Sequence, residues 1–134
     1  MRRLVTVAAV AALAAPAPAV SPDPASLVVP PDATARARSL VQLLGSEAFR
    51  DRDRATRELE QMGRLALAAL LDGRDADDPE VRMRVVRLLP RAEADDMRAR
   101  VDAFLADADG KYHHDLPGWA KFRAVAGDDR PARD

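Results

Sequence analysis

The feature that most constrains this chain is a pattern of arginines and apolar residues that recurs after thirty residues. It runs through residues 46–92, where a helix, a short turn and a second helix are followed by the start of the same pattern. The matched positions are Arg52 with Arg82, Arg54 with Arg84, Ala55 with Val85, Arg57 with Arg87, Leu59 with Leu89, Leu67 with Met97 and Leu71 with Val101. One helical hairpin cannot bury its own apolar side, so repetition at this period is typical of stacked hairpins. The pattern predicts an all-α fold of two to three stacked antiparallel helical hairpins.

The ends of the first helices follow from glycines and one capping residue. Ordered structure is expected to begin near Thr34, and the first helix to end at Gly45. Ser46 can cap the next helix, whose apolar stripe ends at Gly63. A short, almost wholly apolar helix then reaches Gly73, and such a helix requires burial on more than one side.

The clearest helix start comes next. Asp78 is a good N-cap, Pro79 suits the first helical position, and Glu80 complements the helix dipole. Pro90 is expected to end or kink this helix at about Leu89. A further helix is expected over residues 95–108. Its single apolar stripe consists of Met97, Val101, Phe104, Leu105 and Ala108.

Two spacings follow one another in this region, namely Phe49-x-x-Arg52-x-x-Ala55-x-x-x-Leu59-x-x-x-Gly63 and Asp78-Pro79-Glu80-Val81-Arg82-x-Arg84. Together they resemble the short HEAT-like repeat that also occurs in phycobilisome lyase subunits. The resemblance covers roughly residues 38–108 and implies that residues 34–110 are a fragment of an α-solenoid. Longer proteins with such repeats are typically curved scaffolds that bind other proteins. Because about three repeats are needed for an independent stack, the first helix and the C-terminal segment are expected to act as caps.

The N-terminus has the three parts of an export signal. Arg2 and Arg3 precede an uncharged apolar run over residues 4–15, and Ala17-Pro18-Ala19 supplies a cleavage site of small residues. We therefore expect residues 1–19 to be a signal peptide and the mature protein to be periplasmic or extracellular. The run is too short to span a bilayer comfortably, so no stable membrane insertion is expected after cleavage. Residues 20–33 contain several prolines and are interpreted as a linker.

Charge and cysteine content exclude several classes of function. Cleavage after Ala19 would remove two of the 21 basic side chains and none of the 22 acidic ones, which moves the net charge from −1 to about −3. A nucleic acid partner requires a concentrated basic face, so none is expected. The absence of cysteine excludes disulfides, zinc–thiolate sites and thiol catalysis. No cofactor is predicted.

Residues 111–134 differ in character from the rest, because they hold the only Trp, the only Tyr and both His. A helix carrying Trp119 and Phe122 is expected to start at Asp115 or at the Leu116-Pro117 step and to stop at Gly127. We interpret the two aromatic side chains as a lid over the open end of the stack. The alternative is an exposed aromatic anchor for a partner.

One cluster in this segment suggests chemistry, namely Tyr112-His113-His114-Asp115. Adjacent His and Asp side chains can bind a metal ion, but contiguous loop residues rarely converge on one ion. Asp107-x-Asp109-Gly110 has the start of a calcium loop and lacks its later Glu. No hydroxyl lies in a nucleophile motif. The chain is therefore predicted not to be an enzyme.

The sequence thus predicts an exported, non-catalytic, HEAT-like helical-repeat module that binds another protein, whose identity it does not reveal. The candidate binding residues are Arg52, Arg54, Arg82, Arg84 and Trp119. Acidic residues lie between the arginines, which favours a solvated or salt-bridged face between repeats. The alternative function is a small metal-binding protein or metal-dependent enzyme that uses His113, His114 and Asp115.

Overall fold

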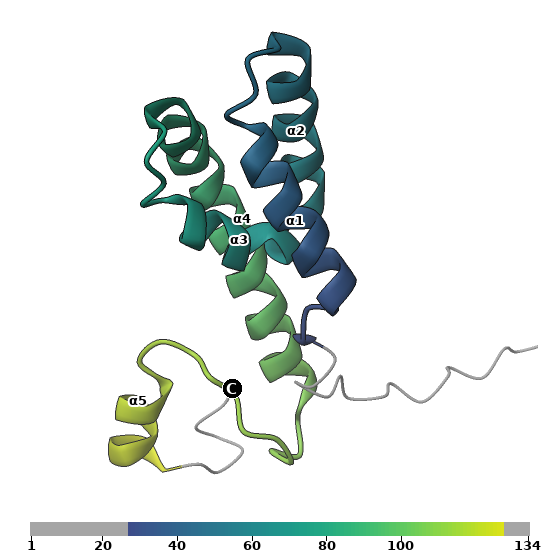
Figure 1. Ribbon diagram of the computed structural model, residues 1–134. Coiled ribbons are helices and arrows are strands. Elements are labelled where there is room, and N and C mark those ends of the chain that lie inside the picture. The colour runs from purple at the N-terminus through teal and green to yellow at the C-terminus, as the bar shows by residue number, and fades with distance from the viewer. Residues whose placement is uncertain (1–26, 128–134) are drawn as a thin grey trace, which may run out of the picture.

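Helices alone build the part of the chain that can be described. The computed structural model describes residues 27–127, and no strand occurs in that range. The elements are α1 (Pro31–Leu43), α2 (Phe49–Met62), the 3₁₀ helix η2 (Gly63–Ala66), α3 (Leu67–Gly73), α4 (Pro79–Ala106) and α5 (Trp119–Ala126). Helices α1 to α4 pack together, and α5 lies beyond the far end of α4 (Figure 1). The predicted all-α class is confirmed.

The first helix begins three residues earlier than expected. Pro31 occupies the first position of α1, where a residue without an N–H is tolerated, and the amide of Thr34 donates to the carbonyl of Pro30 at 3.0 Å. The preceding segment is held to the helices, because Arg64 Nη1 donates to the carbonyl of Leu27 at 2.8 Å. The predicted signal peptide, residues 1–19, and residues 20–26 of the predicted linker lie outside the described residues.

The second helix ends as predicted but begins later. Ser46 is not its N-cap. The Ser46 hydroxyl accepts the amide of Ala48 within the loop, and Ala48 is the residue that precedes α2. Gly63 ends α2 with a φ of 52°, a conformation that favours glycine. A Cβ atom on Gly63 would also lie 2.8 Å from Asp95 Oδ2 of α4.

The start of α4 confirms the prediction, whereas its course does not. The Asp78 carboxylate accepts the amide of Glu80 at 2.8 Å, and Pro79 is the first helical residue. The helix then continues through Pro90 to Ala106, so of the two effects predicted for Pro90, an end or a kink, the helix end at Leu89 is wrong. Pro90 is exposed and so is Val86, whose carbonyl would otherwise accept an N–H at position 90. Solvent at this side of the helix can satisfy that carbonyl instead.

The second half of α4 leaves most of the predicted apolar stripe exposed. Met97, Val101 and Leu105 are exposed, whereas Phe104 contacts Trp119. Residues 27–127 contain no separate helix that would complete a second pair with this half. Leu67 and Met97, which the thirty-residue pattern matches, therefore do not occupy equivalent environments. Leu67 packs against the core, whereas Met97 does not. Periodicity predicted the apolar face correctly but could not show whether another element covers it.

The core lies between α1, α2, η2, α3 and the first half of α4. Its buried residues are Ala37, Leu40, Val41, Leu44, Ala55, Leu59, Ala66, Ala69, Leu70, Val81, Val85, Leu88, Leu89 and Ala92. Small side chains allow the helices to approach closely. Gly73 is one such close approach, because a Cβ atom there would lie 2.8 Å from Val41 Cγ1 of α1 and 3.2 Å from Val85 Cγ2 of α4.

Part of the thirty-residue pattern corresponds to equivalent contacts. Arg52 Nη1 donates to the carbonyls of Ser46 and Glu47 at 2.7 and 2.9 Å. Arg82 Nη1 donates to the carbonyls of Ala76 and Asp77, again six and five residues earlier, at 2.6 and 2.8 Å. The buried pairs Ala55 with Val85 and Leu59 with Leu89 follow the same offset. These contacts and buried positions of α2 and of the first half of α4 thus share the thirty-residue offset.

Candidate binding surfaces

Two of the four predicted binding arginines hold helices of the same chain together. Arg52 Nε of α2 lies 3.6 Å from Glu80 Oε1 of α4, and Arg84 Nε lies 2.7 Å from the same oxygen. Arg84 Nη1 also donates to Thr56 Oγ1 of α2 at 3.2 Å, and that hydroxyl donates to the carbonyl of Arg52 at 2.8 Å. The side chains of Arg52 and Arg84 are only 21% and 18% exposed, so they are positioned to join α2 to α4.

The other two arginines are exposed. Arg54 forms ion pairs with Asp51 and Glu58 of its own helix, at 3.4 and 4.0 Å. Exposed pairs of this kind add little stability. Arg82 donates to the loop before α4, and no carboxylate of residues 27–127 lies within ion-pair distance of it. Of the four, Arg82 therefore keeps the most capacity for an external anion.

Trp119 is the first residue of α5 and belongs to an aromatic group. Helix α5 lies near the far end of α4, away from the four packed helices (Figure 1). Its ring centroid is 4.8 Å from that of Phe104 of α4 and 5.5 Å from that of Phe122 of α5. Both distances are typical of packed aromatic pairs. Gly127 ends α5 with a φ of 87°, as predicted. The aromatic side chains thus attach α5 to α4.

A buried Asp–His pair shapes the loop between α4 and α5. Asp107 is 1% exposed and His114 is 7% exposed, and Asp107 Oδ2 lies 3.0 Å from His114 Nε2. Asp107 also accepts the amides of Lys111 and Tyr112, at 2.9 and 3.0 Å. Burial raises the pKa of Asp107. The hydrogen bonds from Tyr112, His114 and Lys111, together with the charge interaction with His114, outweigh that effect and lower its pKa from 3.8 to about 2.

The suspected metal ligands are engaged separately. His114 faces Asp107, whereas Asp115 accepts a hydrogen bond from Arg100 at 3.4 Å, and His113 is exposed. In the described ranges no group of three or more His, Asp or Glu side chains is arranged to hold a metal ion. The structure therefore does not bring His113, His114 and Asp115 together as a ligand set.

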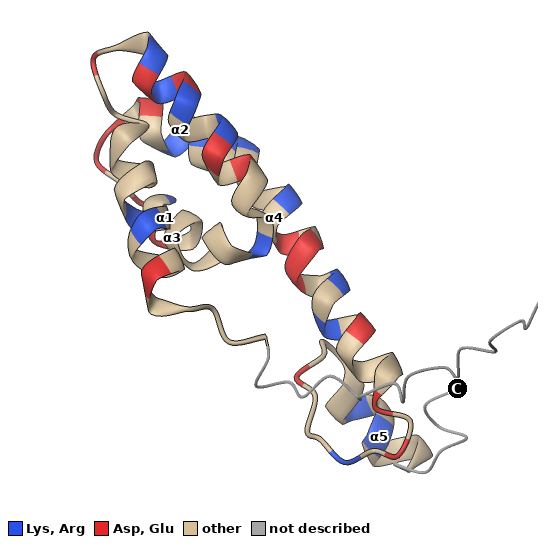
Figure 2. Ribbon diagram, turned by 90° about the vertical axis from the view of Figure 1, so that its right-hand side faces the viewer, with Lys and Arg blue, Asp and Glu red and all other residues tan. Residues whose placement is uncertain are grey.

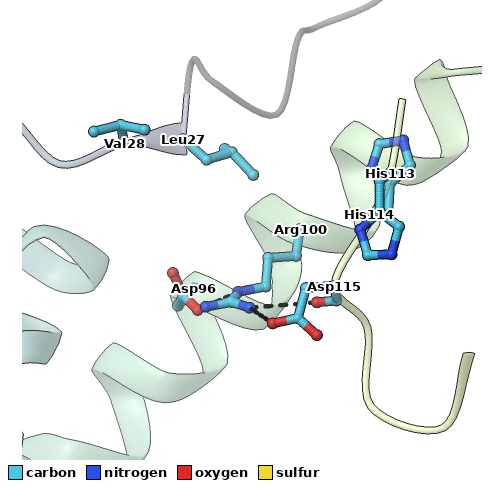
Figure 3. A pocket seen from close by; sticks show the side chains of 7 residues that line it. All are labelled: Leu27, Val28, Asp96, Arg100, His113, His114 and Asp115. Atoms are coloured by element: carbon cyan, nitrogen blue, oxygen red, sulfur yellow. Dashed lines mark hydrogen bonds and ion pairs between the residues drawn. The ribbon is translucent and has the colours of Figure 1, made fainter. Parts of the chain in front are cut away.

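A small cavity lies beside this loop (Figure 3). Its volume is about 270 Å³, and its lining residues are Leu27, Val28, Asp96, Arg100, His113, His114 and Asp115. The Arg100 guanidinium is bound by Asp96 at 2.7 Å and by the side chain and carbonyl of Asp115. Because Arg100 already has two carboxylate partners, it offers little positive charge to an anionic ligand.

The most distinctive surface is the side of α3 and α4 that is turned away from α1 and α2. Leu71, Met83 and Val86 are exposed large apolar side chains on these two helices. Figure 1 shows no described helix against the upper part of this side. Figure 2, turned by 90° from Figure 1, shows basic and acidic residues along α2.

Comparison of the chain with known protein families, with curated proteins and with solved structures finds no match. Separately, no helix in the described part is both long and apolar enough to cross a membrane.

Sequence reasoning missed Asp107 as the residue that organises the C-terminal loop. It considered Asp107 only as a possible calcium ligand beside Asp109 and Gly110. The one available signal was its place in the last turn of the helix predicted over residues 95–108, where a carboxylate can accept amides of the following turn. The partner His114 lies seven residues later, a spacing that follows from the loop path and from no local rule.

Proposed function

We propose that this chain is an exported helical-repeat module of the HEAT-like type that binds another protein through a helical surface and has no catalytic activity of its own. In this reading the first hairpin is α1–α2, and the second consists of η2, α3 and the first half of α4. The second half of α4 and α5 form an extension.

The observation that supports this reading most directly is the equivalence of Arg52 and Arg82. Each is held by two carbonyls of the loop before its helix, at the same sequence separations. Leu40 of α1 and Leu70 of α3 are both buried and also lie thirty residues apart. A repeated local contact together with repeated burial is expected when successive hairpins shelter each other's apolar sides.

Binding is favoured over catalysis by what the surface exposes. Six of the exposed large apolar side chains lie on two helices, with Leu71 on α3 and Met83, Val86, Met97, Val101 and Leu105 on α4. Exposed apolar patches of this kind are typical of protein contact sites. The metal-dependent alternative has less support, because His114 and Asp115 have other partners in the same chain.

Export rests on the sequence alone. A basic start, an apolar run and a small-residue site within residues 1–19 support removal of the leader after Ala19. Mass measurement of the chain recovered from its own cells tests this: we expect a mature protein that begins at Val20 and is found outside the cytoplasm. A full-length chain in the cytoplasm would contradict export.

The binding role is tested by expressing the full chain with a C-terminal tag in its own cells and capturing it after mild crosslinking. We expect one protein in about stoichiometric amount. Recovery of no protein from any compartment would contradict a binding role. If the captured protein also binds the unfolded tagged chain, that result would contradict specific binding through a helical surface.

A further inference from the structure

The contacts between the α1–α2 hairpin and the α3–α4 hairpin show how one side of α1–α2 is covered. Arg52, Thr56 and Val41 make three of the contacts between α1–α2 and the next hairpin. Arg52 pairs with Glu80, Thr56 accepts from Arg84, and Val41 lies against Gly73. They combine one ion pair, one polar contact and one close apolar contact.

Thirty residues further on, the same three positions are occupied by Arg82, Val86 and Leu71. Val41 is 8% exposed because the second hairpin covers it, whereas Leu71 is 39% exposed and Val86 is 56% exposed. Arg82 is held against its loop as Arg52 is, but no carboxylate of the described chain takes the place of Glu80. The second hairpin therefore presents the equivalent contact positions without a cover.

From this correspondence we propose that the side of α3–α4 formed by Leu71, Arg82 and Val86 docks an α-helical hairpin of another protein. The proposal rests on the proposed repeat function and specifies its partner. The docked hairpin would take the position that α3–α4 takes on α1–α2. Its second helix would carry an Asp or Glu near its start, facing Arg82 as Glu80 faces Arg52. Apolar side chains of the same hairpin would cover Val86 and Leu71.

Charge argues against a second copy of this chain as the occupant. In a head-to-tail stack, the α1–α2 side of one copy would face α3–α4 of the next. Arg50 and Glu80 are each the second residue of their helix, so Arg50 would stand where an acidic residue is needed. Arg50 would then face Arg82, and like charges across an interface are unfavourable.

The test is site-specific photocrosslinking of the full chain in its own cells. A photoreactive residue replaces Val86 in one variant, Arg50 in a second and Val125 in a third. Val125 is an exposed apolar residue of α5, far along the chain from the proposed surface. The crosslinked peptides are then identified by mass spectrometry.

We expect the probe at position 86 to label a helical hairpin of another protein, at a helix that carries Asp or Glu near its start. Val86→Glu should reduce that product by about tenfold or more, because it places a carboxylate in an apolar contact and supplies Arg82 with a partner in its own chain. The matched variant Val125→Glu should leave the product unchanged.

Three results would overturn the inference. Labelling of a second copy from position 86 would show self-association in place of a partner. Labelling of a partner only from position 50 or 125 would leave the binding function intact and place the contact elsewhere. No labelling from any position would contradict both the inference and the proposed function.

Discussion

Arg52 and Arg82 make the same pair of hydrogen bonds at points thirty residues apart, yet only Arg52 also has a carboxylate partner, Glu80, across the helix interface. The shared bonds fix the loop before each helix. The ion pair exists only where a following hairpin provides it. This difference connects the internal packing of the molecule with the surface we propose for binding.

The first prediction compares two alanine substitutions. Arg52→Ala removes two hydrogen bonds to carbonyls and the contact with Glu80, so it should lower the free energy of unfolding by about 2 kcal/mol. Arg82→Ala removes only the bonds to its loop and should lower it by about 1 kcal/mol. Urea denaturation followed by circular dichroism measures both values. An equal loss for the two variants would argue against a role for Arg52 between helices.

A second prediction concerns the proline within α4. Pro90→Ala supplies an N–H for the carbonyl of Val86 and removes the proline ring from the helix interior. We expect the free energy of unfolding to rise by about 2 kcal/mol, since an interior proline costs about 3 kcal/mol and the more flexible unfolded chain offsets part of that gain. Thermal unfolding tests this. An unchanged or lowered midpoint would mean that the chain leaves the helix at Leu89.

The third prediction is a pH dependence of the C-terminal loop. The pKa of Asp107 is lowered in the folded protein to about 2 from 3.8, so the unfolded loop binds a proton more readily. The stability contributed by Asp107 is therefore complete above the unfolded pKa and is lost as the pH falls through the folded pKa. Trp119 is the only tryptophan, and its fluorescence should change between about pH 4 and pH 2 as its contact with Phe104 is released.

Asp107→Asn is the control for this experiment. It keeps the size of the side chain and removes its titration, so the fluorescence change over that range should disappear. The same acid transition in the variant would show that other carboxylates control the loop.

A fourth prediction separates the binding module from the metal-dependent alternative. Calorimetric titration of the mature protein with zinc should show no stoichiometric tight binding, because Asp107 and Arg100 engage His114 and Asp115. His113→Ala is the informative variant, since His113 is exposed and its loss leaves the Asp107–His114 pair in place. Tight one-to-one binding that His113→Ala abolishes would favour the alternative.

Local chemistry made several helix ends predictable. Asp78 and Pro79 start α4, and Gly63 and Gly127 end α2 and α5, because each acts through neighbours within one turn of helix. The interleaved acids favoured a solvated or salt-bridged face, and Arg52 pairs with Glu80 between α2 and α4.

Contacts made through the folded chain were not predictable in this way. The stripe of Met97 and Val101 has the period of a buried face, but burial depends on whether another element reaches it. The bond from Arg64 to Leu27 joins residues 37 apart in sequence. The effect of Pro90 depended on the exposure of its side of α4, which the sequence pattern does not determine.

Amide hydrogen exchange across residues 31–126 tests the central claim most directly, namely that two hairpins stabilise each other and that the rest of α4 is an extension. We predict that α1, α2, α3 and α4 up to about Ala92 share one slow exchange regime and open together, whereas the later part of α4 and α5 exchange faster. Independent opening of α1–α2, or equal protection along the whole of α4, would contradict the account.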